Sequence, residues 1–240
     1  EELMTNKSCI VLGLGPSTGA SVARRFAKAG YSIAVAARRA EHLDPLVSEI
    51  EKAGGKAIAV ETDATDEAAV KELVQRTETD LGPLGVAVYN ASGRVKGSIL
   101  DLDAAEVMNA WKISCLGGFL LGREAARRMV PQKEGTILFT GATSGMRGSA
   151  EFAGFAIGKF GLRALAQSMA RELGPKGIHV AYANIDGQIH TPRQAHLAAD
   201  RLPDAMLDPE AIAESYFQLH SQHRSAWTQE LDLRPWVEKF

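Results

Sequence analysis

A lysine follows a phenylalanine by four residues in the stretch FAGFAIGKFG, residues 152–161. This spacing places Phe155 and Lys159 on one face of the helix that the surrounding pattern predicts. A lysine side chain brings a positive charge and three hydrogen-bond donors, but a phenyl ring has no ionisable hydrogen. Acid–base chemistry at this helix therefore needs a group other than Phe155.

A second segment has the composition of a phosphate-binding turn. The sequence GLGPSTG, residues 13–19, directly follows a predicted strand and opens a predicted helix. A glycine-rich turn at that place lets the backbone approach a pyrophosphate, whose charge is met by free N–H groups and by the helix dipole. The alternative is a tight turn with no ligand. The candidate contacts are Gly13, Gly15, Ser17, Thr18 and Gly19.

These segments sit in a regular alternation of strand and helix patterns. Short apolar or β-branched runs predict strands at residues 8–14, 32–37, 56–61, 86–91, 135–141, 178–185 and about 230–233. Amphipathic patterns predict helices at residues 19–30, 41–55, 66–77, about 103–129, about 153–173 and about 209–220. The alternation is typical of a parallel sheet covered by helices on both faces. Because no linker or repeat interrupts it, we predict a single domain over residues 1–240.

The amino-acid composition argues against several classes of binding partner. The 240 residues carry a formal net charge of −2 without a basic stripe, which argues against general binding to nucleic acid or to an anionic membrane. No apolar run approaches the ~18–20 residues that cross a bilayer, and the histidines have no zinc-like arrangement. Cys9 and Cys115 lie in apolar segments and are interpreted as reduced core residues, so we expect a cytoplasmic protein without a metal.

Several motifs together resemble those of the short-chain dehydrogenase/reductase family. Gly13 and Gly19 are six apart with Ser17 between them, which resembles the family's G-x-x-x-G-x-G turn with its middle glycine replaced. The stretch YNASG, residues 89–93, resembles its N-N-A-G, FAIGK its Y-x-x-x-K, and DGQIHTP, residues 186–192, its P-G-x-x-x-T-P. The resemblance covers roughly residues 8–192 and implies a Rossmann-type doubly wound α/β fold that binds a nicotinamide cofactor.

The end of the second strand indicates which cofactor. An acidic residue there would accept the ribose hydroxyls of NAD and repel the 2′-phosphate of NADP. This chain instead has Ala37, followed by Arg38 and Arg39. Cations near a helix start oppose the dipole, whereas a bound 2′-phosphate would favour them through charge-assisted hydrogen bonds. We therefore predict NADP(H); the alternative is a pair of solvated arginines.

The resemblance also implies roles for residues farther along the chain. Asp63 would contact the adenine, and Asn90 and Ala91 would line the adenosine ribose. For Asp63 the alternative is a role in a turn or a helix cap. Lys159 would bind the nicotinamide ribose. The segment that would hold the nicotinamide amide comprises Gly187, Ile189 and Thr191.

Three of the family's four catalytic positions are replaced. The tyrosine position is Phe155, the serine position is Ala142 and the asparagine position is Ser114, so only Lys159 remains. No tyrosine lies between residues 90 and 181, and thus no shift of register restores one to the helix. Phe155 is interpreted either as a packing residue or as an apolar wall against nicotinamide or substrate. Candidate substitutes for the lost groups, each with a plain loop or packing role as its alternative, are Thr143, Ser144, Tyr89, Asp186 and His190.

The sequence thus predicts an NADP(H)-dependent oxidoreductase with a non-standard catalytic site, acting on a small carbonyl-like molecule. Two alternatives stay open: a catalytically inactive NADP(H)-binding regulatory or partner module, and a non-redox enzyme on the same fold. Members of the family associate through their two long helices, so the resemblance implies a homodimer or homotetramer.

Overall fold

Seven parallel strands form one sheet in the computed structural model, which describes residues 7–15, 17–39, 43–191, 196 and 202–238. The order across the sheet is β3-β2-β1-β4-β5-β6-β7. Strands β2 and β3 are added on one side of β1 and strands β4 to β7 on the other, so the topological switch point lies between β1 and β4. The strands are β1 Ser8–Leu12, β2 Ser32–Ala37, β3 Ala57–Glu61, β4 Leu84–Tyr89, β5 Gly135–Thr140, β6 Ile178–Ile185 and β7 Glu230–Leu233. The predicted Rossmann-type doubly wound fold is confirmed.

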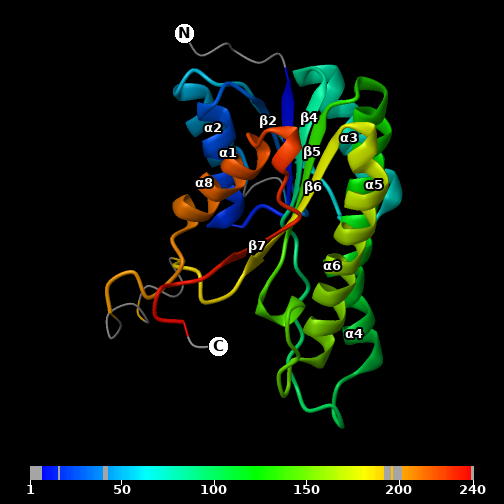
Figure 1. Cartoon of the computed structure of the whole chain (residues 1–240), viewed down its shortest axis with the longest axis vertical. Coiled ribbons are helices and arrows are strands. Elements are labelled where there is room, and N and C mark those ends of the chain that lie inside the picture. The colour runs from blue at the N-terminus through cyan, green and yellow to red at the C-terminus, as the bar shows by residue number, and fades with distance from the viewer. Residues whose placement is uncertain (1–6, 16, 40–42, 192–195, 197–201, 239–240) are drawn as a thin grey trace.

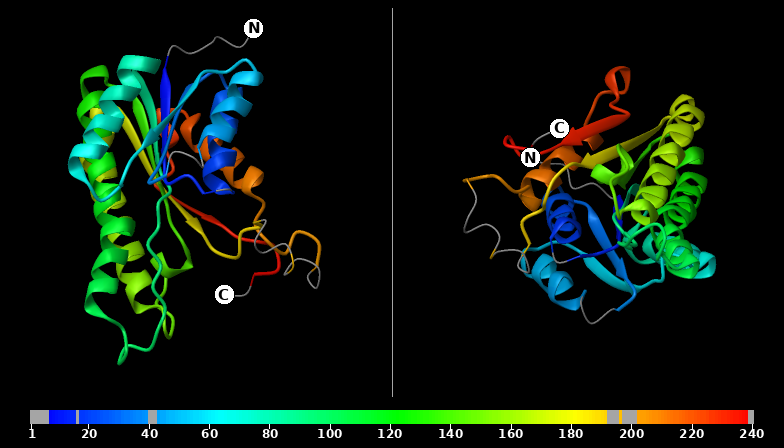
Figure 2. Two further views of the ribbon diagram at one scale, coloured as in Figure 1. Left: turned by 180° about the vertical axis from the view of Figure 1, so that it is seen from behind. Right: turned by 90° about the horizontal axis from the view of Figure 1, so that it is seen from below.

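Helices cover both faces of the sheet (Figures 1 and 2). One face carries α1 Thr18–Lys28, α2 Asp44–Lys52 and α8 Pro209–His220, and the other carries α3 Glu67–Leu81, α4 Ala104–Trp111, α5 Gly117–Gln132 and α6 Ala153–Leu173. Alternate strand residues point to opposite faces, so Ile10 and Leu12 join one buried apolar cluster while Cys9 and Val11 join the other. The sheet is therefore buried on both sides, as a parallel sheet requires.

The first and fourth strands end two residues earlier than the sequence pattern predicts. After Leu12 the chain turns, and the N–H groups of Gly13 and Leu14 both donate to the Ala36 carbonyl, at 2.9 and 3.2 Å. After Tyr89 the Asn90 N–H donates to the Leu12 carbonyl at 2.8 Å. The apolar residues beyond these points pack in loops rather than in the sheet.

The helix predicted at about 103–129 contains an unpredicted irregularity. A π-helical turn, η2 Lys112–Leu116, separates α4 from α5, and α5 continues to Gln132. A π turn takes in an extra residue and redirects the side chains around it. Ser114 lies at the centre of this turn and is fully buried.

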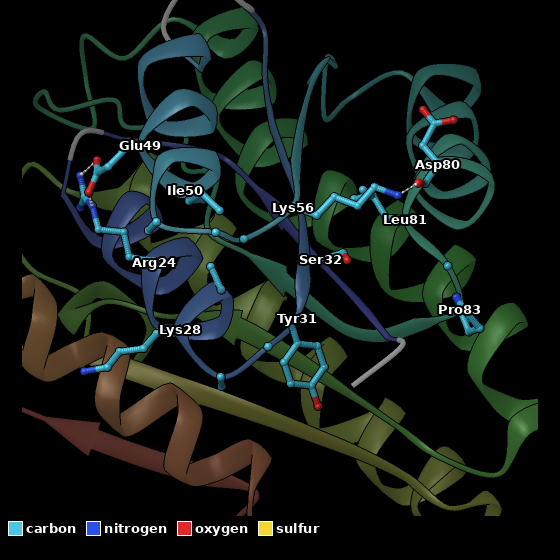
Figure 3. Close-up of a pocket in the computed structure, with 17 residues that line it drawn as sticks. Arg24, Lys28, Tyr31, Ser32, Glu49, Ile50, Lys56, Asp80, Leu81 and Pro83 are labelled. Atoms are coloured by element: carbon cyan, nitrogen blue, oxygen red, sulfur yellow. Dashed lines mark hydrogen bonds and ion pairs between the residues drawn. The ribbon is translucent and has the colours of Figure 1, made fainter. Parts of the chain in front are cut away.

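A cavity of about 960 Å³ opens at the edge of the sheet where β2, β3 and β4 begin (Figure 3). Arg24 and Glu49 form an ion pair at its rim, with 2.7 Å between Nε and Oε1, and Lys56 Nζ donates to the Asp80 carbonyl. The candidate site residues predicted from the sequence lie near the carboxyl ends of the strands instead. This cavity lies at the amino ends of the strands, on the opposite side of the sheet from the candidate site.

Among the described residues, no helix combines the length and hydropathy that a bilayer span requires.

Candidate functional site

The glycine-rich turn after β1 is packed against the end of β4. Gly13 has φ +98°, and a Cβ there would lie 2.1 Å from the Ala91 nitrogen, so only glycine fits. Asn90 Nδ2 donates to the Gly13 carbonyl at 2.8 Å, which ties the two loops together. A Cβ on Gly15 would meet nothing within 4 Å, so this residue borders open space. The predicted neighbours Gly13, Asn90 and Ala91 are thus brought together.

The N-terminus of α1 has features that an anion would satisfy. Ser17 occupies the N-cap but makes no side-chain capping bond, and the first turn of α1 has no acidic residue. Thr18 Oγ1 is buried and has no hydrogen-bond partner among the described residues. An orphaned hydroxyl and uncapped N–H groups at the positive end of a helix dipole match a pyrophosphate. The residues present therefore fit a dinucleotide.

The loops after β2 and β3 lie beside this turn in the sheet order. Arg38 and Arg39 are exposed directly after β2, and neither has an ion pair with a described carboxylate. Asp63 accepts hydrogen bonds from the backbone N–H and the hydroxyl of Thr65, both at 2.8 Å. The backbone bond is the main reason that the pKa of Asp63 lies below its usual value. Asp63 therefore stabilises this turn, and its predicted contact with the adenine stays a prediction.

The segment after β6 is held in an extended conformation. The Leu207 N–H donates to the Gln188 carbonyl, and the His190 N–H donates to the Leu207 carbonyl, both at 2.8 Å. Gly187 has φ +152°, and a Cβ there would lie 2.7 Å from Pro235 Cδ. Ile189 and Thr191 are half-buried along this segment, whereas His190 is exposed. Pro192, the last residue of the motif, lies outside the described residues.

Lys159 is buried at the carboxyl end of β5. Its side chain is 2% exposed, and Nζ donates to the Thr140 carbonyl at 2.8 Å. Burial lowers the pKa of Lys159 from its usual 10.5 to about 8. Nζ lies 5.9 Å from the ring centroid of Phe155, which is half-buried. The structure thus places a buried amine directly beside the position of the absent tyrosine.

The hydroxyl groups of Ser114 and Thr143, at or beside two of the replaced positions, already take part in internal hydrogen bonds. Ser114 Oγ accepts from the Gly93 N–H at 3.0 Å and donates to the Gly93 carbonyl at 3.1 Å. Thr143 follows the half-buried Ala142 and donates its only hydroxyl hydrogen to Asp186 Oδ1 at 2.7 Å. Neither hydroxyl is available to a substrate carbonyl unless its internal bond breaks.

Asp186 and Thr143 were separate candidates in the sequence, and the structure joins them. The Asp186 carboxylate is buried, and the guanidinium groups of Arg147 and Arg234 both lie 3.7 Å from its oxygens. The pair belongs to an ionic cluster that ties the loop after β5 to the loop after β7. No local pattern indicated this, because the partners are 43 residues apart.

Tyr89 is not available as a substitute acid. Its side chain is fully buried in the core, and its hydroxyl donates to the carbonyl of Ile113 in the π turn. Burial raises the pKa of Tyr89 far above its usual value. Its position at the carboxyl end of β4 suggested contact with a ligand, but the alternation along the strand directs the ring under α5.

Sequence reasoning missed Arg94, which lies next to the replaced tyrosine position. Its guanidinium carbon is 5.3 Å from the ring centroid of Phe152 and 5.7 Å from that of Phe155. The signal available in the sequence was the position of Arg94, directly after the YNASG motif.

Comparison with known proteins agrees with the fold and the motifs. A family model for short chain dehydrogenases matches residues 7–202. The chain is 31% identical over 233 residues to a cis-4-hydroxycyclohexanecarboxylate dehydrogenase from Sinomonas cyclohexanicum, with 93% of each chain covered. It is 32% identical over 192 residues to a 3-oxoacyl-(acyl-carrier-protein) reductase from Rattus norvegicus, with 80% of this chain and 79% of the relative covered.

Solved structures give the same result. A short-chain dehydrogenase from Rhodopseudomonas palustris matches with a TM-score of 0.84 and 39% identity, over 97% of this chain and 100% of that one. A metagenomic short-chain oxidoreductase in complex with NADP has the same fold, with a TM-score of 0.84 and 24% identity, over 98% and 99% of the two chains. The match over residues 7–202, with these relatives, shows that the chain belongs to the short-chain dehydrogenase/reductase family of oxidoreductases.

Proposed function

We propose that this protein is an NADP(H)-dependent oxidoreductase with a non-standard catalytic site, acting on a small carbonyl-like molecule. The observation that carries the proposal is the buried amine of Lys159 beside Phe155, at the carboxyl edge of the sheet. Burying an ammonium group costs folding free energy, so a lysine kept there indicates a function rather than a contribution to stability.

The residues that would hold NADP(H) lie near the carboxyl ends of the parallel strands, most of them in the loops that follow those strands. The turn at Gly13 and the orphaned hydroxyl of Thr18 would take the pyrophosphate, and Arg38 and Arg39 the 2′-phosphate. Asp63, Asn90 and Ala91 would border the adenosine, and Lys159, Gly187, Ile189 and Thr191 the nicotinamide riboside. When bound, NADP(H) would supply or accept a hydride.

The proton would be held by Lys159 itself. Since Phe155 carries no proton and Thr143 donates its hydroxyl hydrogen to Asp186, we assign the acid role to the Lys159 ammonium, 5.9 Å from the Phe155 centroid. Its pKa of about 8 suits proton transfer near neutral pH. In the reductive direction, Nζ would give a proton to the substrate oxygen as the carbonyl carbon gains the hydride. The neutral amine would then regain a proton from water.

A catalytically inactive NADP(H)-binding module is the second candidate. The observation that favours it is that Ser114 and Thr143, next to replaced catalytic positions, use their hydroxyls in internal hydrogen bonds. Titration calorimetry with NADPH, followed by absorbance at 340 nm over a panel of aldehydes, ketones, imines and enones, separates the two. Binding with turnover supports the oxidoreductase, and binding without turnover supports the module.

The double variant Arg38→Glu with Arg39→Glu tests the choice of cofactor. We expect its Kd for NADPH to rise about 10- to 100-fold, the size of one charge-assisted hydrogen bond lost, while its Kd for NADH changes little. Fluorescence titration of both cofactors measures this. Arg224→Glu makes the same type of change at an exposed arginine after α8 and serves as the control. Equal weakening of NADH and NADPH would contradict the assignment of the 2′-phosphate.

Exposed apolar side chains on α4, α5 and α6 support the proposed homodimer or homotetramer. The exposed fractions are 52% for Met108, 40% for Phe119, 53% for Ile157 and 41% for Phe160. We expect light scattering to give the mass of two or four chains, and Ile157→Glu with Phe160→Glu to shift it toward one. A mass of a single chain for the unchanged protein would contradict this expectation.

A further inference from the structure

The loop that carries Arg94 is fixed on both sides of this residue. On one side Gly93 is held by both hydrogen bonds of Ser114, and a Cβ on Gly93 would lie 2.7 Å from Ala110 Cα. On the other side Val95 packs so closely on α6 that a Cβ at Gly154 would lie 2.3 Å from Val95 Cγ1. Arg94 therefore projects from a fixed backbone, even though its side chain is exposed.

The guanidinium of Arg94 rests near the rings of two phenylalanines. The centroid distances of 5.3 Å to Phe152 and 5.7 Å to Phe155 lie within the range of cation–π contact. Such contacts restrict the guanidinium but occupy none of its five N–H donors. The group is thus oriented while its hydrogen-bonding edge stays available.

Arg94 differs from Lys96 and Arg147 in having no anionic partner among the residues that the structure describes. Lys96 is paired with Glu151 at 3.2 Å, and Arg147 lies 3.7 Å from Asp186. Among the described residues, no carboxylate forms an ion pair or hydrogen bond with Arg94. The loop therefore presents one oriented, uncompensated guanidinium at the edge of the proposed catalytic site.

The ring of Phe155 also lies close to Lys159. The guanidinium of Arg94 and the amine of Lys159 are both within 6 Å of the Phe155 centroid. We infer that Arg94 binds a carboxylate on the substrate, which makes the substrate class a small oxo acid or the corresponding hydroxy acid. The inference rests on the proposed function, because it takes the reacting carbonyl to lie at Lys159. The phenyl ring would contact the apolar part of the molecule between its two polar ends.

A carboxylate suits this guanidinium for geometric reasons. Its two oxygens match two parallel N–H groups, which gives a bidentate pair that a lysine in the same place cannot form. An aromatic contact beneath the guanidinium displaces water from one of its faces and strengthens the pair. Arg94 would therefore select acids over neutral compounds of the same shape.

The test compares oxo acids with their neutral esters. The probes are levulinate and 4-acetylbenzoate, each paired with its methyl ester, and the readout is kcat/KM with NADPH. We expect the unchanged protein to prefer the acid, and Arg94→Met to lower the ratio of acid to ester at least about tenfold, mainly through KM for the acid. Arg94→Lys should recover only part of the preference. An equal effect on acid and ester, or no preference to begin with, would overturn the inference.

A matched control variant shows whether the effect is specific to Arg94. A binding measurement tests the role of Arg94 even if the protein proves to have no turnover. Lys96→Met removes a neighbouring cation that already has an acidic partner, so it should leave the ratio near its original value. If NADPH binds but neither these probes nor any compound of the wider panel is turned over, the proposed function fails. Benzoate titrated against the NADP⁺ complex then decides the inference: binding weakened by Arg94→Met supports it, and equal or absent binding overturns it. Inorganic phosphate in the same titration distinguishes a carboxylate site from a general anion site, and tighter binding of phosphate would overturn the assignment.

Discussion

Replacing Lys159 with methionine is expected to slow NADPH-linked turnover by orders of magnitude while it stabilises the fold. Loss of the proton-holding group should lower kcat about 10²- to 10⁴-fold. The same change removes a buried ammonium whose pKa is lowered from 10.5 to about 8. This lowering of the pKa means that burying the charged ammonium costs about 3 kcal/mol of folding free energy at neutral pH. The lost hydrogen bond to Thr140 offsets about 1 kcal/mol of the gain.

The stabilising effect should depend on pH in a defined direction. Between pH 8 and 10.5 the unfolded chain binds more protons at Lys159 than the folded chain, so the stability of the unchanged protein rises with pH through this window. The advantage of Lys159→Met is therefore full below pH 8 and disappears above about pH 10.5. At pH 7 we expect Tm to rise by about 4–8 °C.

Calorimetric melting at pH 7 and pH 10, with NADPH oxidation at pH 7, measures both effects. Lys176→Met is the control, because this lysine is exposed and has only a surface ion pair with Glu172. It should change neither Tm nor turnover appreciably. A variant at Lys159 that retains turnover would show that another group holds the proton. A fall in Tm would show that the lysine is a structural residue.

The second large effect is expected from restoring two of the three replaced side chains of the family pattern. Phe155→Tyr with Ala142→Ser places a phenol next to the Lys159 amine and a hydroxyl at the start of the η3 turn, Thr143–Gly145. A nearby cation lowers the pKa of a phenol and so makes it a better acid. We expect turnover to rise at least about 10-fold, because the phenol and hydroxyl add to a site in which Lys159 already supplies part of the 10²- to 10⁴-fold contribution of a positioned acid.

The neighbouring phenylalanine supplies a matched control. Phe152→Tyr adds the same hydroxyl to a second ring in contact with Arg94, at the N-cap of α6, but no contact joins this ring to Lys159. It should leave turnover within about twofold, since an acid outside the reacting geometry contributes little. If the double variant binds NADPH as before and gains nothing, the site differs from that of its relatives in more than its missing hydroxyls.

Much of the fold could be predicted from the sequence because its signals are local. Strand and helix periods, the glycine turn at residues 13–19 and the position of Lys159 each depend on neighbours within one element. A parallel sheet with helices on both faces follows from the alternation of elements, whereas the order of the strands comes from the structure. The loops that border the candidate site follow these strands directly, so the same local signals predict them.

What could not be predicted depends on contacts between distant segments. The π turn at Ser114 is anchored on Gly93, and the Thr143 hydroxyl is taken by Asp186 from another strand end. Tyr89 ends β4, where ligands commonly bind, but packing under α5 buries its side chain. The orientation of Arg94 over two rings needs the loop after β4 to dock on α6. None of these pairings leaves a period or a spacing in the sequence.

The central proposal is that hydride transfer takes place with Lys159, rather than a tyrosine, as the source of the proton. The most direct measurement is the single-turnover rate of NADPH oxidation as a function of pH, with a substrate found in the panel. The rate should be constant below pH 8 and fall as pH rises through about 8, because the Lys159 ammonium loses its proton there. A rate that is independent of pH across this range, or a complete absence of NADPH oxidation with any substrate, would contradict it.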